Sequence, residues 1–170
     1  MAAMPVDRQP PTDAPAGAVW VACVDAPLDA GTAAAWVTVP ACGAVVTFAG
    51  TVRDHAGDRT GVTALEYEAY EGHVERVLAE VADELRVRHP DLGRAAIWHR
   101  VGTLAVTDVA VVVAVSTGHR DGAFTAARWA IDEVKARAPI WKREHHAAGV
   151  DWGRCDHDPA LPPAPVEAVR

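Results

Sequence analysis

The segment Val109-Ala-Val-Val-Val-Ala-Val-Ser-Thr117 decides the fold, because it opens with an apolar run of seven residues that is as long as any in the chain. Its small and β-branched side chains predict a strand that is buried on both faces. The segment leads through Gly118-His-Arg-Asp into a helix that we expect over 122–138, which Pro139 ends. The run from Val109 to Val115 is too short to cross a bilayer, so no membrane-spanning segment is expected.

Further strands and helices are expected on both sides of this segment. β-Branched runs and period-two alternation predict strands at 18–24, 43–52, 62–70 and 95–104, and a closing hairpin from 140–146 and 150–154. Helices are expected at about 27–37 and 74–85, the second from apolar residues at i, i+3 and i+4 spacing. Adjacent strands with packed helices predict an α+β fold rather than a regular βαβ winding. The inward stripe of the 122–138 helix is expected to hold Phe124, Ala127, Ile131, Val134 and Ala138.

Length and composition indicate one globular domain. The chain has 170 residues, of which 50% are hydrophobic and 23% are charged. Prolines crowd both ends, so we expect a disordered leader at 1–16, a single domain at 17–156 and a proline-rich tail at 157–170. A net charge of −7 argues against a general nucleic-acid binder, which needs a basic surface.

The cysteines and the N-terminus indicate the compartment. Cys23, Cys42 and Cys155 are widely spaced and odd in number, which fits neither a disulfide framework nor a zinc ribbon. The first residues contain no apolar region of signal-peptide length. Both observations predict a cytoplasmic protein.

Several common catalytic motifs do not occur. The glycines never take the G-x-G-x-x-G or P-loop spacing, and the single serine, Ser116, does not lie in a nucleophile elbow.

A metal site from His145, His146, Cys155 and His157 is a weak candidate, because adjacent strand residues point to opposite faces. Solvated histidines are the better interpretation, and no metal is expected. A surface loop explains a second candidate, Asp54, His55 and Asp58, equally well.

Three cations lie where anions are readily bound. Arg53 ends an apolar strand, from which a guanidinium can project toward a bidentate anion. His119 and Arg120 follow the buried strand and lead into a helix, whose first amides also favour an anion. This junction is therefore a candidate for binding phosphate or carboxylate.

Further cations surround the end of the 122–138 helix. Lys135 and Arg137 have an equally good structural explanation, because cations near a helix C-terminus complement its dipole. Lys142 shares a strand face with Ile140 and Glu144, so its amine is expected to be partly desolvated. Burial lowers the pKa of a lysine, which makes its amine usable as a base or nucleophile.

Five segments, taken in order, resemble one family. The resemblance is to the large, catalytic subunits of molybdopterin synthase, the MoaE family, and covers about 18–155. The segments are Gly43-Ala-Val-Val-Thr-Phe-Ala-Gly-Thr-Val-Arg53, Leu65-Glu-Tyr-Glu-Ala-Tyr70, His99-Arg-Val-Gly102, Ser116-Thr-Gly-His-Arg120 and Lys135-Ala-Arg-Ala-Pro-Ile-Trp-Lys-Arg-Glu144.

The resemblance implies an α/β hammerhead fold with an additional small antiparallel sheet. It implies a central homodimer that binds two copies of a separate ubiquitin-like carrier, giving a heterotetramer. The carrier's C-terminal Gly-Gly would bear a thiocarboxylate. Two sulfurs would pass from it to cyclic pyranopterin monophosphate, giving the dithiolene of molybdopterin, with neither cofactor nor metal required for the transfer.

Roles carry over by motif. Lys135 and Lys142 match the family's two important lysines, one of which could act as general base while the other stabilises charge. The substrate-binding positions are Phe48, Arg53, His119 and Arg120, with part of each pocket coming from the neighbouring protomer. The family often has a basic residue where Asp156 stands, and Arg154 could substitute for it.

Two other functions stay open at this point. A dimeric binding module could keep the anion pocket without turnover, and an acyl-thioester enzyme could use the same cations as an oxyanion site. The enzyme hypothesis requires that Arg53, His119, Arg120, Lys135 and Lys142 converge in one electropositive pocket, within one copy or between two. Two anionic reactants would otherwise repel each other in a low-dielectric cleft.

Overall fold

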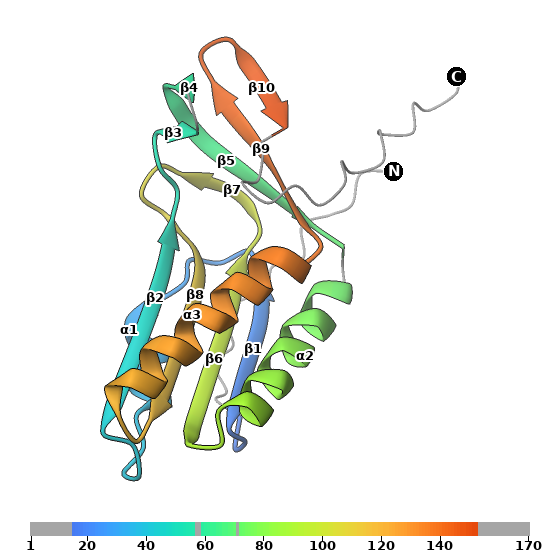
Figure 1. The fold of residues 1–170 in the computed structure, drawn as a ribbon. Helices are drawn as coiled ribbons and strands as arrows, with labels where there is room; N and C mark the ends of the chain where they lie inside the picture. The colour runs from blue at the N-terminus through green and yellow to red at the C-terminus, as the bar shows by residue number, and fades with distance from the viewer. Residues whose placement is uncertain (1–14, 57–58, 71, 153–170) are drawn as a thin grey trace.

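A computed structural model describes residues 15–56, 59–70 and 72–152 (Figure 1). Most of the expected leader and the whole expected tail, with Arg154 and Asp156, therefore lie outside the described residues. The helices are α1 (Ala30–Val37), α2 (His73–Arg88) and α3 (Arg120–Arg137). The strands are β1 (Val19–Val24), β2 (Ala44–Thr51), β3 (His55–Ala56), β4 (Arg59–Thr60), β5 (Val62–Ala69), β6 (Leu92–Arg100), β7 (Gly102–Ala105), β8 (Val109–Thr117), β9 (Ile140–His146) and β10 (Gly149–Trp152).

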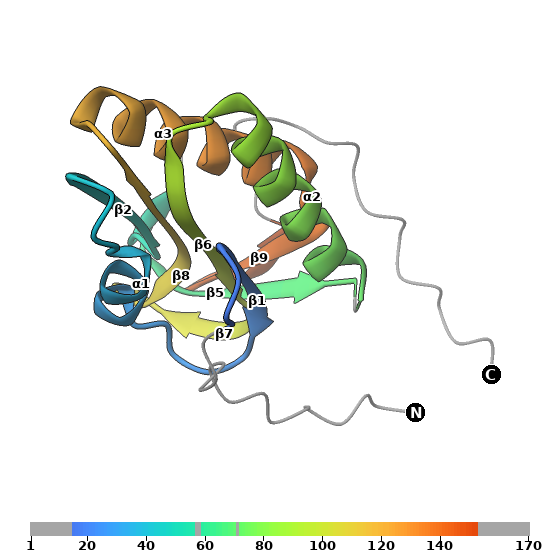
Figure 2. The ribbon, with the colours of Figure 1, turned by 90° about the horizontal axis from the view of Figure 1, so that it is seen from below.

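The larger sheet has the order β1-β6-β8-β2 and lies between helices. β1 runs parallel to β6, and the other pairs are antiparallel. α2 and α3 cover one face and α1 covers the other (Figures 1 and 2). Alternate residues of β8 enter the two cores, with Val113 facing α2 and α3 and Val112 facing α1. The prediction of a doubly buried strand is confirmed, and so is the α+β class.

The second sheet is antiparallel, with the order β10-β9-β5-β7. Its inner face buries Leu65 and Leu104 against Val52 and Ala110, which lie at one end of the larger sheet. The predicted single strand at 95–104 is wrong, because β6 and β7 belong to different sheets. Gly102, with φ of 86°, occupies the left-handed region as the chain passes from one sheet to the other.

Two further details of the sequence-based prediction are wrong. Period-two alternation in the predicted strand at 62–70 puts Val62 and Leu65 on opposite faces, but a register shift between Val62 and Ala64 lets both enter one core. Phe124 is 65% exposed rather than part of the inward stripe of α3. That stripe is formed by Ala123, Ala126, Ala127, Ala130, Ile131 and Val134.

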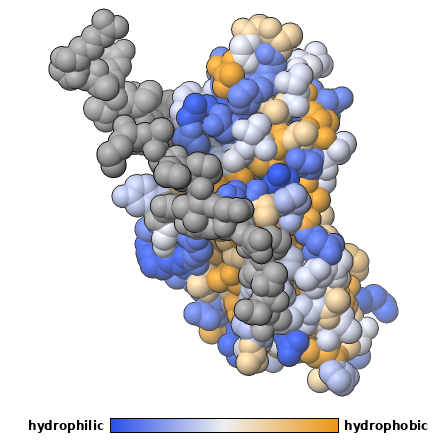
Figure 3. All heavy atoms as spheres, turned by 180° about the vertical axis from the view of Figure 1, so that it is seen from behind, coloured by the Kyte–Doolittle hydropathy of each residue, from blue (hydrophilic) through white to orange (hydrophobic). Residues whose placement is uncertain are grey.

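The surface loop expected around Asp54, His55 and Asp58 contains the two-residue strands β3 and β4, which pair with each other. Apolar and hydrophilic side chains are interspersed on the face seen from behind (Figure 3). Within the described residues no helix is both long and apolar enough to span a membrane.

Candidate functional site

The β8–α3 turn forms a hollow of about 400 Å³, lined by Gly43, Ala44, Gly118, His119, Arg120 and Asp121. The hydroxyl of Thr117 donates a 2.7 Å hydrogen bond to the carbonyl of His119, which fixes the turn. Gly43 permits the close approach of β2, since a Cβ there would lie 2.9 Å from the carbonyl oxygen of Gly118. His119 is the N-cap of α3 but its side chain makes no capping hydrogen bond. The hollow therefore combines an imidazole, a guanidinium and a helix N-terminus.

The two lysines lie around the opposite end of α3. Lys135 occupies the last helical turn and is exposed, whereas Lys142 lies two residues into β9. The ammonium nitrogen of Lys142 is 3.5 Å from Oε1 of Glu144, and the two side chains are 20% and 4% exposed. The prediction that Lys142 shares a face with Glu144 is confirmed. A nearly buried carboxylate thus holds one lysine in place.

Arg53 and Phe48 both come from the β2 segment. Arg53 is exposed and follows Val52, whose amide donates a 2.9 Å hydrogen bond to the carbonyl of Asp108. Phe48 is half-buried at the middle of β2 and packs against the core shared with α2 and α3. Among the residues that the structure describes, neither Arg53 nor Lys135 forms an ion pair with a carboxylate. Both cations are therefore available to a ligand.

The five predicted cations do not converge within one copy of the chain. β2 and β8 are antiparallel, with Ala44 opposite Thr117 and Thr51 opposite Val109. Arg53 and His119 follow opposite ends of this ladder, and the eight steps between the nine residues of β8, at about 3.4 Å each, span roughly 27 Å. Arg120 and Lys135 are separated by about 23 Å along α3, at roughly 1.5 Å per residue. A pocket that uses all five requires a second molecule.

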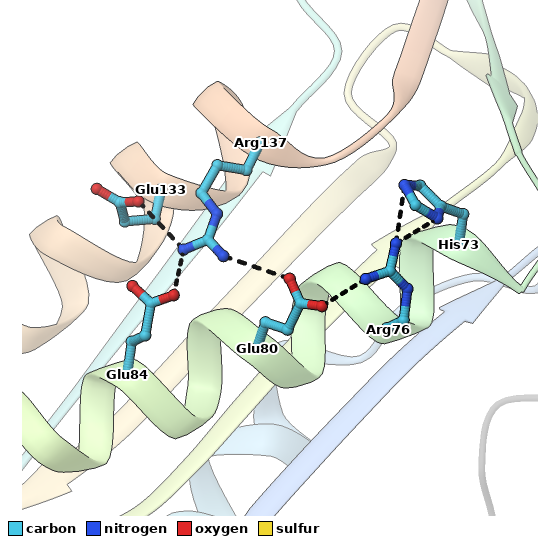
Figure 4. A network of polar contacts seen from close by, with 6 residues as sticks. All are labelled: His73, Arg76, Glu80, Glu84, Glu133 and Arg137. Atoms are coloured by element: carbon cyan, nitrogen blue, oxygen red, sulfur yellow. Dashed lines mark hydrogen bonds and ion pairs between the residues drawn. The ribbon is translucent and has the colours of Figure 1, made fainter.

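Arg137, the cation nearest to Lys135 on the C-terminal turn of α3, has a structural role. Its guanidinium contacts Glu84 at 2.8 Å, Glu80 at 3.4 Å and Glu133 at 3.5 Å, and so ties α3 to α2 (Figure 4). The hydrogen bond that this guanidinium donates to Glu84 is the main cause that raises its pKa. The same network continues from Glu80 through Arg76 to His73 (Figure 4).

The neighbouring histidines on β9 contact separate carboxylates. His145 lies 3.3 Å from Glu66 on β5, and His146 lies 3.0 Å from Asp151 on β10. The other two members of the weak metal candidate, Cys155 and His157, fall outside the described residues. Across the described part of the chain, no group of three or more potential metal ligands is clustered.

His99 is a buried titratable group whose pKa is shifted far from its ordinary value. Burial lowers its pKa to about 4, although a 2.8 Å hydrogen bond from Nδ1 to the carbonyl of Arg100 opposes this. Its ring meets the ring of Tyr67 edge to face, with centroids 5.3 Å apart. The imidazole is therefore neutral in the folded protein near pH 7.

We predict that His99 makes the protein less stable in mild acid. The unfolded chain binds a proton at its ordinary pKa of 6.5 and the folded chain only near 4, so the contribution is complete above pH 6.5 and is lost as the pH falls to 4. The loss should be about 3 kcal/mol in the free energy of unfolding. Urea unfolding of wild type and His99→Asn between pH 4 and 8 measures it. Parallel pH profiles of the two proteins would contradict the prediction.

The small number of lysines relative to arginines gives information that motif spacing does not give. The sequence contains 16 lysines and arginines, but only two of them, Lys135 and Lys142, are lysines. Arginine cannot lose its proton near neutral pH, whereas lysine can, so the two are not interchangeable in proton transfer. The contrast singles out the same two residues as the motif does. Sequence reasoning assigned no role to Glu144, because its proximity to the ammonium group is a matter of side-chain packing.

Comparisons with known proteins agree on one family. The family model described as "MoaE protein" matches residues 23–137. A molybdopterin synthase catalytic subunit of Halalkalibacterium halodurans is 48% identical over 117 residues, covering 68% of this chain and 73% of that protein. The crystal structure of molybdopterin synthase from Staphylococcus aureus matches with a TM-score of 0.73 and 35% identity, over 78% of this chain and 96% of that one.

A more distant solved structure shares the fold. It is a complex of subunits 1 and 2 of the molybdopterin-converting factor from Helicobacter pylori, with a TM-score of 0.63 and 17% identity, over 84% of this chain and 94% of that one.

Proposed function

Because this chain belongs to the MoaE family, we propose that it converts cyclic pyranopterin monophosphate to molybdopterin, in molybdenum cofactor biosynthesis. The two sulfurs come from the C-terminal thiocarboxylate of a small ubiquitin-like carrier. The observation that carries this proposal is the position of the only two lysines in the sequence, which flank the α3–β9 junction, one of them beside a buried carboxylate.

Each sulfur transfer replaces a carbon–oxygen bond of the substrate side chain with a carbon–sulfur bond, and it breaks the acyl–sulfur bond of the carrier. The carrier ends as a carboxylate, and water supplies its new oxygen atom. An ammonium group beside the acyl carbon stabilises the oxyanion that develops there. A lysine that gives up its proton serves as general base, a role that arginine cannot fill. The geometry supports either lysine in either role.

The hollow at the start of α3 suits the phosphate of the substrate. His119 and Arg120 contribute positive charge, and the uncapped first turn contributes amide donors and the positive end of the helix dipole. Arg53 lies at the other end of the β2–β8 ladder, so its guanidinium, which no described carboxylate neutralises, comes to this site from the second copy of the chain. Phe48, at the middle of β2, and Arg154 complete the proposed substrate-binding set.

We place each complete site between two copies of the chain. The separations of about 27 Å along the β2–β8 ladder and 23 Å along α3 prevent one copy from supplying all five cations. In a twofold dimer, the hollow of one copy faces the lysines of the other. The carrier binds outside this homodimer, which gives a heterotetramer with the α/β hammerhead as its core. This assembly works in the cytoplasm. The H. pylori complex is a related precedent for a two-subunit assembly.

Incubation with cyclic pyranopterin monophosphate and thiocarboxylated carrier tests the function. We expect the dithiolene product, detected as its fluorescent oxidised derivative, together with a larger complex on size exclusion. Complex formation without product would favour a binding module that lacks turnover. Release of carrier carboxylate without sulfur on the pterin would favour an acyl-thioester enzyme.

A further inference from the structure

Tyr67 lies directly across the second sheet from Lys142. The two residues are paired in the β5–β9 register, so their side chains emerge on the same face. Directly opposed residues have Cβ atoms about 4.5–5.5 Å apart, well within the reach of an aromatic ring. On its other side Tyr67 pairs with Gly102, which has no side chain. Lys142 is thus the cross-strand side chain next to this ring.

The Tyr67 ring also contacts a residue of the larger sheet. The buried His99 ring meets it edge to face, with an interplanar angle of 74°. The hydrogen bond from His99 to the carbonyl of Arg100 fixes the imidazole in turn. An aromatic pair of this geometry is stabilising beyond the effect of the area that it buries. The larger sheet, through β6, therefore supports the ring beside Lys142.

We propose that Tyr67 is a positioning residue for Lys142. Its ring packs along the four-carbon stem of the lysine, which otherwise has many rotamers, and keeps the ammonium group beside Glu144. His99 acts one step further back by orienting the ring. The proposal rests on the proposed function for its catalytic consequence, but the placement of the amine can be measured without turnover.

Acylation of the lysine amines by an N-hydroxysuccinimide ester tests the placement. Because the sequence has only two lysines, Lys135 serves as the internal reference for Lys142 in each sample. Quantitative mass spectrometry of wild type, Tyr67→Leu and Tyr67→Phe gives the ratio of the two rates. We expect Tyr67→Leu to raise the ratio severalfold, and Tyr67→Phe, which keeps the ring, to restore it. His99→Asn should raise it as well and provides a second variant if Tyr67→Leu does not fold.

Two controls separate positioning from loss of stability. Tyr70→Leu removes a tyrosine that is 68% exposed just beyond β5 and should leave the ratio unchanged. Leu28→Ala weakens the core on the α1 face, remote from Lys142, and should lower the melting temperature without changing the ratio. An unchanged ratio in both Tyr67→Leu and His99→Asn would overturn the proposal. An equal rise in Leu28→Ala would also overturn it.

Kinetics test the catalytic consequence. In Tyr67→Leu we expect kcat for dithiolene formation to fall about tenfold with an unchanged KM for the carrier, because only the reacting geometry is disturbed. A rise in KM with unchanged kcat would contradict a positioning role. If wild type forms no dithiolene, the proposed function fails while the acylation ratio still decides the placement of Lys142.

Discussion

Arginine in place of Lys142 is expected to reduce dithiolene formation by at least about 100-fold, although the positive charge is kept. The guanidinium cannot lose a proton, and its charge is spread over a planar group instead of being concentrated where the ammonium nitrogen lies, 3.5 Å from Glu144. Lys135→Arg should have an effect of similar size. The measurement is product formed per thiocarboxylated carrier in a single turnover.

Arg128→Lys is the matched control for the lysine variants. Arg128 lies on the exposed face of α3 and pairs with Asp132 at 2.7 Å. Its replacement by lysine exchanges a guanidinium for an ammonium group at a position away from the site. It should leave turnover unchanged. Retention of more than a tenth of wild-type turnover by both Lys142→Arg and Lys135→Arg would show that charge alone suffices.

Two inactive variants are expected to complement each other within one dimer. Arg120→Ala and Lys142→Ala should each be nearly inactive as homodimers. A heterodimer purified through two different tags keeps one intact site, in which the Arg120→Ala copy supplies both lysines and the Lys142→Ala copy supplies Arg120. Its activity should be about half that of wild type, since one of its two equivalent sites is complete.

A heterodimer of Lys135→Ala with Lys142→Ala is the control for complementation. Both substitutions fall in the same group of lysines, so each of its sites lacks one lysine and it should stay inactive. If the Arg120→Ala and Lys142→Ala pair were inactive too, each site would lie within a single copy. That result would contradict the shared pocket. Arg120 and Lys135 are about 23 Å apart along α3, so a site within one copy could not use both of them.

The elements with local signals could be predicted well. Strand β8 was predicted with its bounds, because a β-branched apolar run is buried whatever surrounds it. Helix α2 was predicted from apolar residues at i, i+3 and i+4 spacing. The segment 95–104 was wrong as one strand, since only partner strands reveal that β6 and β7 lie in different sheets. The prediction that Phe124 belongs to the inward stripe was wrong, because helical spacing does not fix which face of the helix is buried.

The candidate site divides in the same way. Residue types and motif order singled out Arg53, His119, Arg120, Lys135 and Lys142, and the resemblance gave them roles that stay proposals. Spacing in the sequence could not show that the β2–β8 ladder and the length of α3 keep them in two groups. Nor could it show which residue lies opposite Lys142, because register depends on a partner strand distant in sequence.

The sequence by itself determined the family, the α+β class and the chemistry of the side chains, because each depends on residue identity and short-range periodicity. The tertiary structure alone decided which charges lie near one another. It set Glu144 beside one ammonium group, Tyr67 across from it, and His119 with Arg120 at the far end of α3. These distances follow from strand pairing and helix length, which act between residues far apart along the chain.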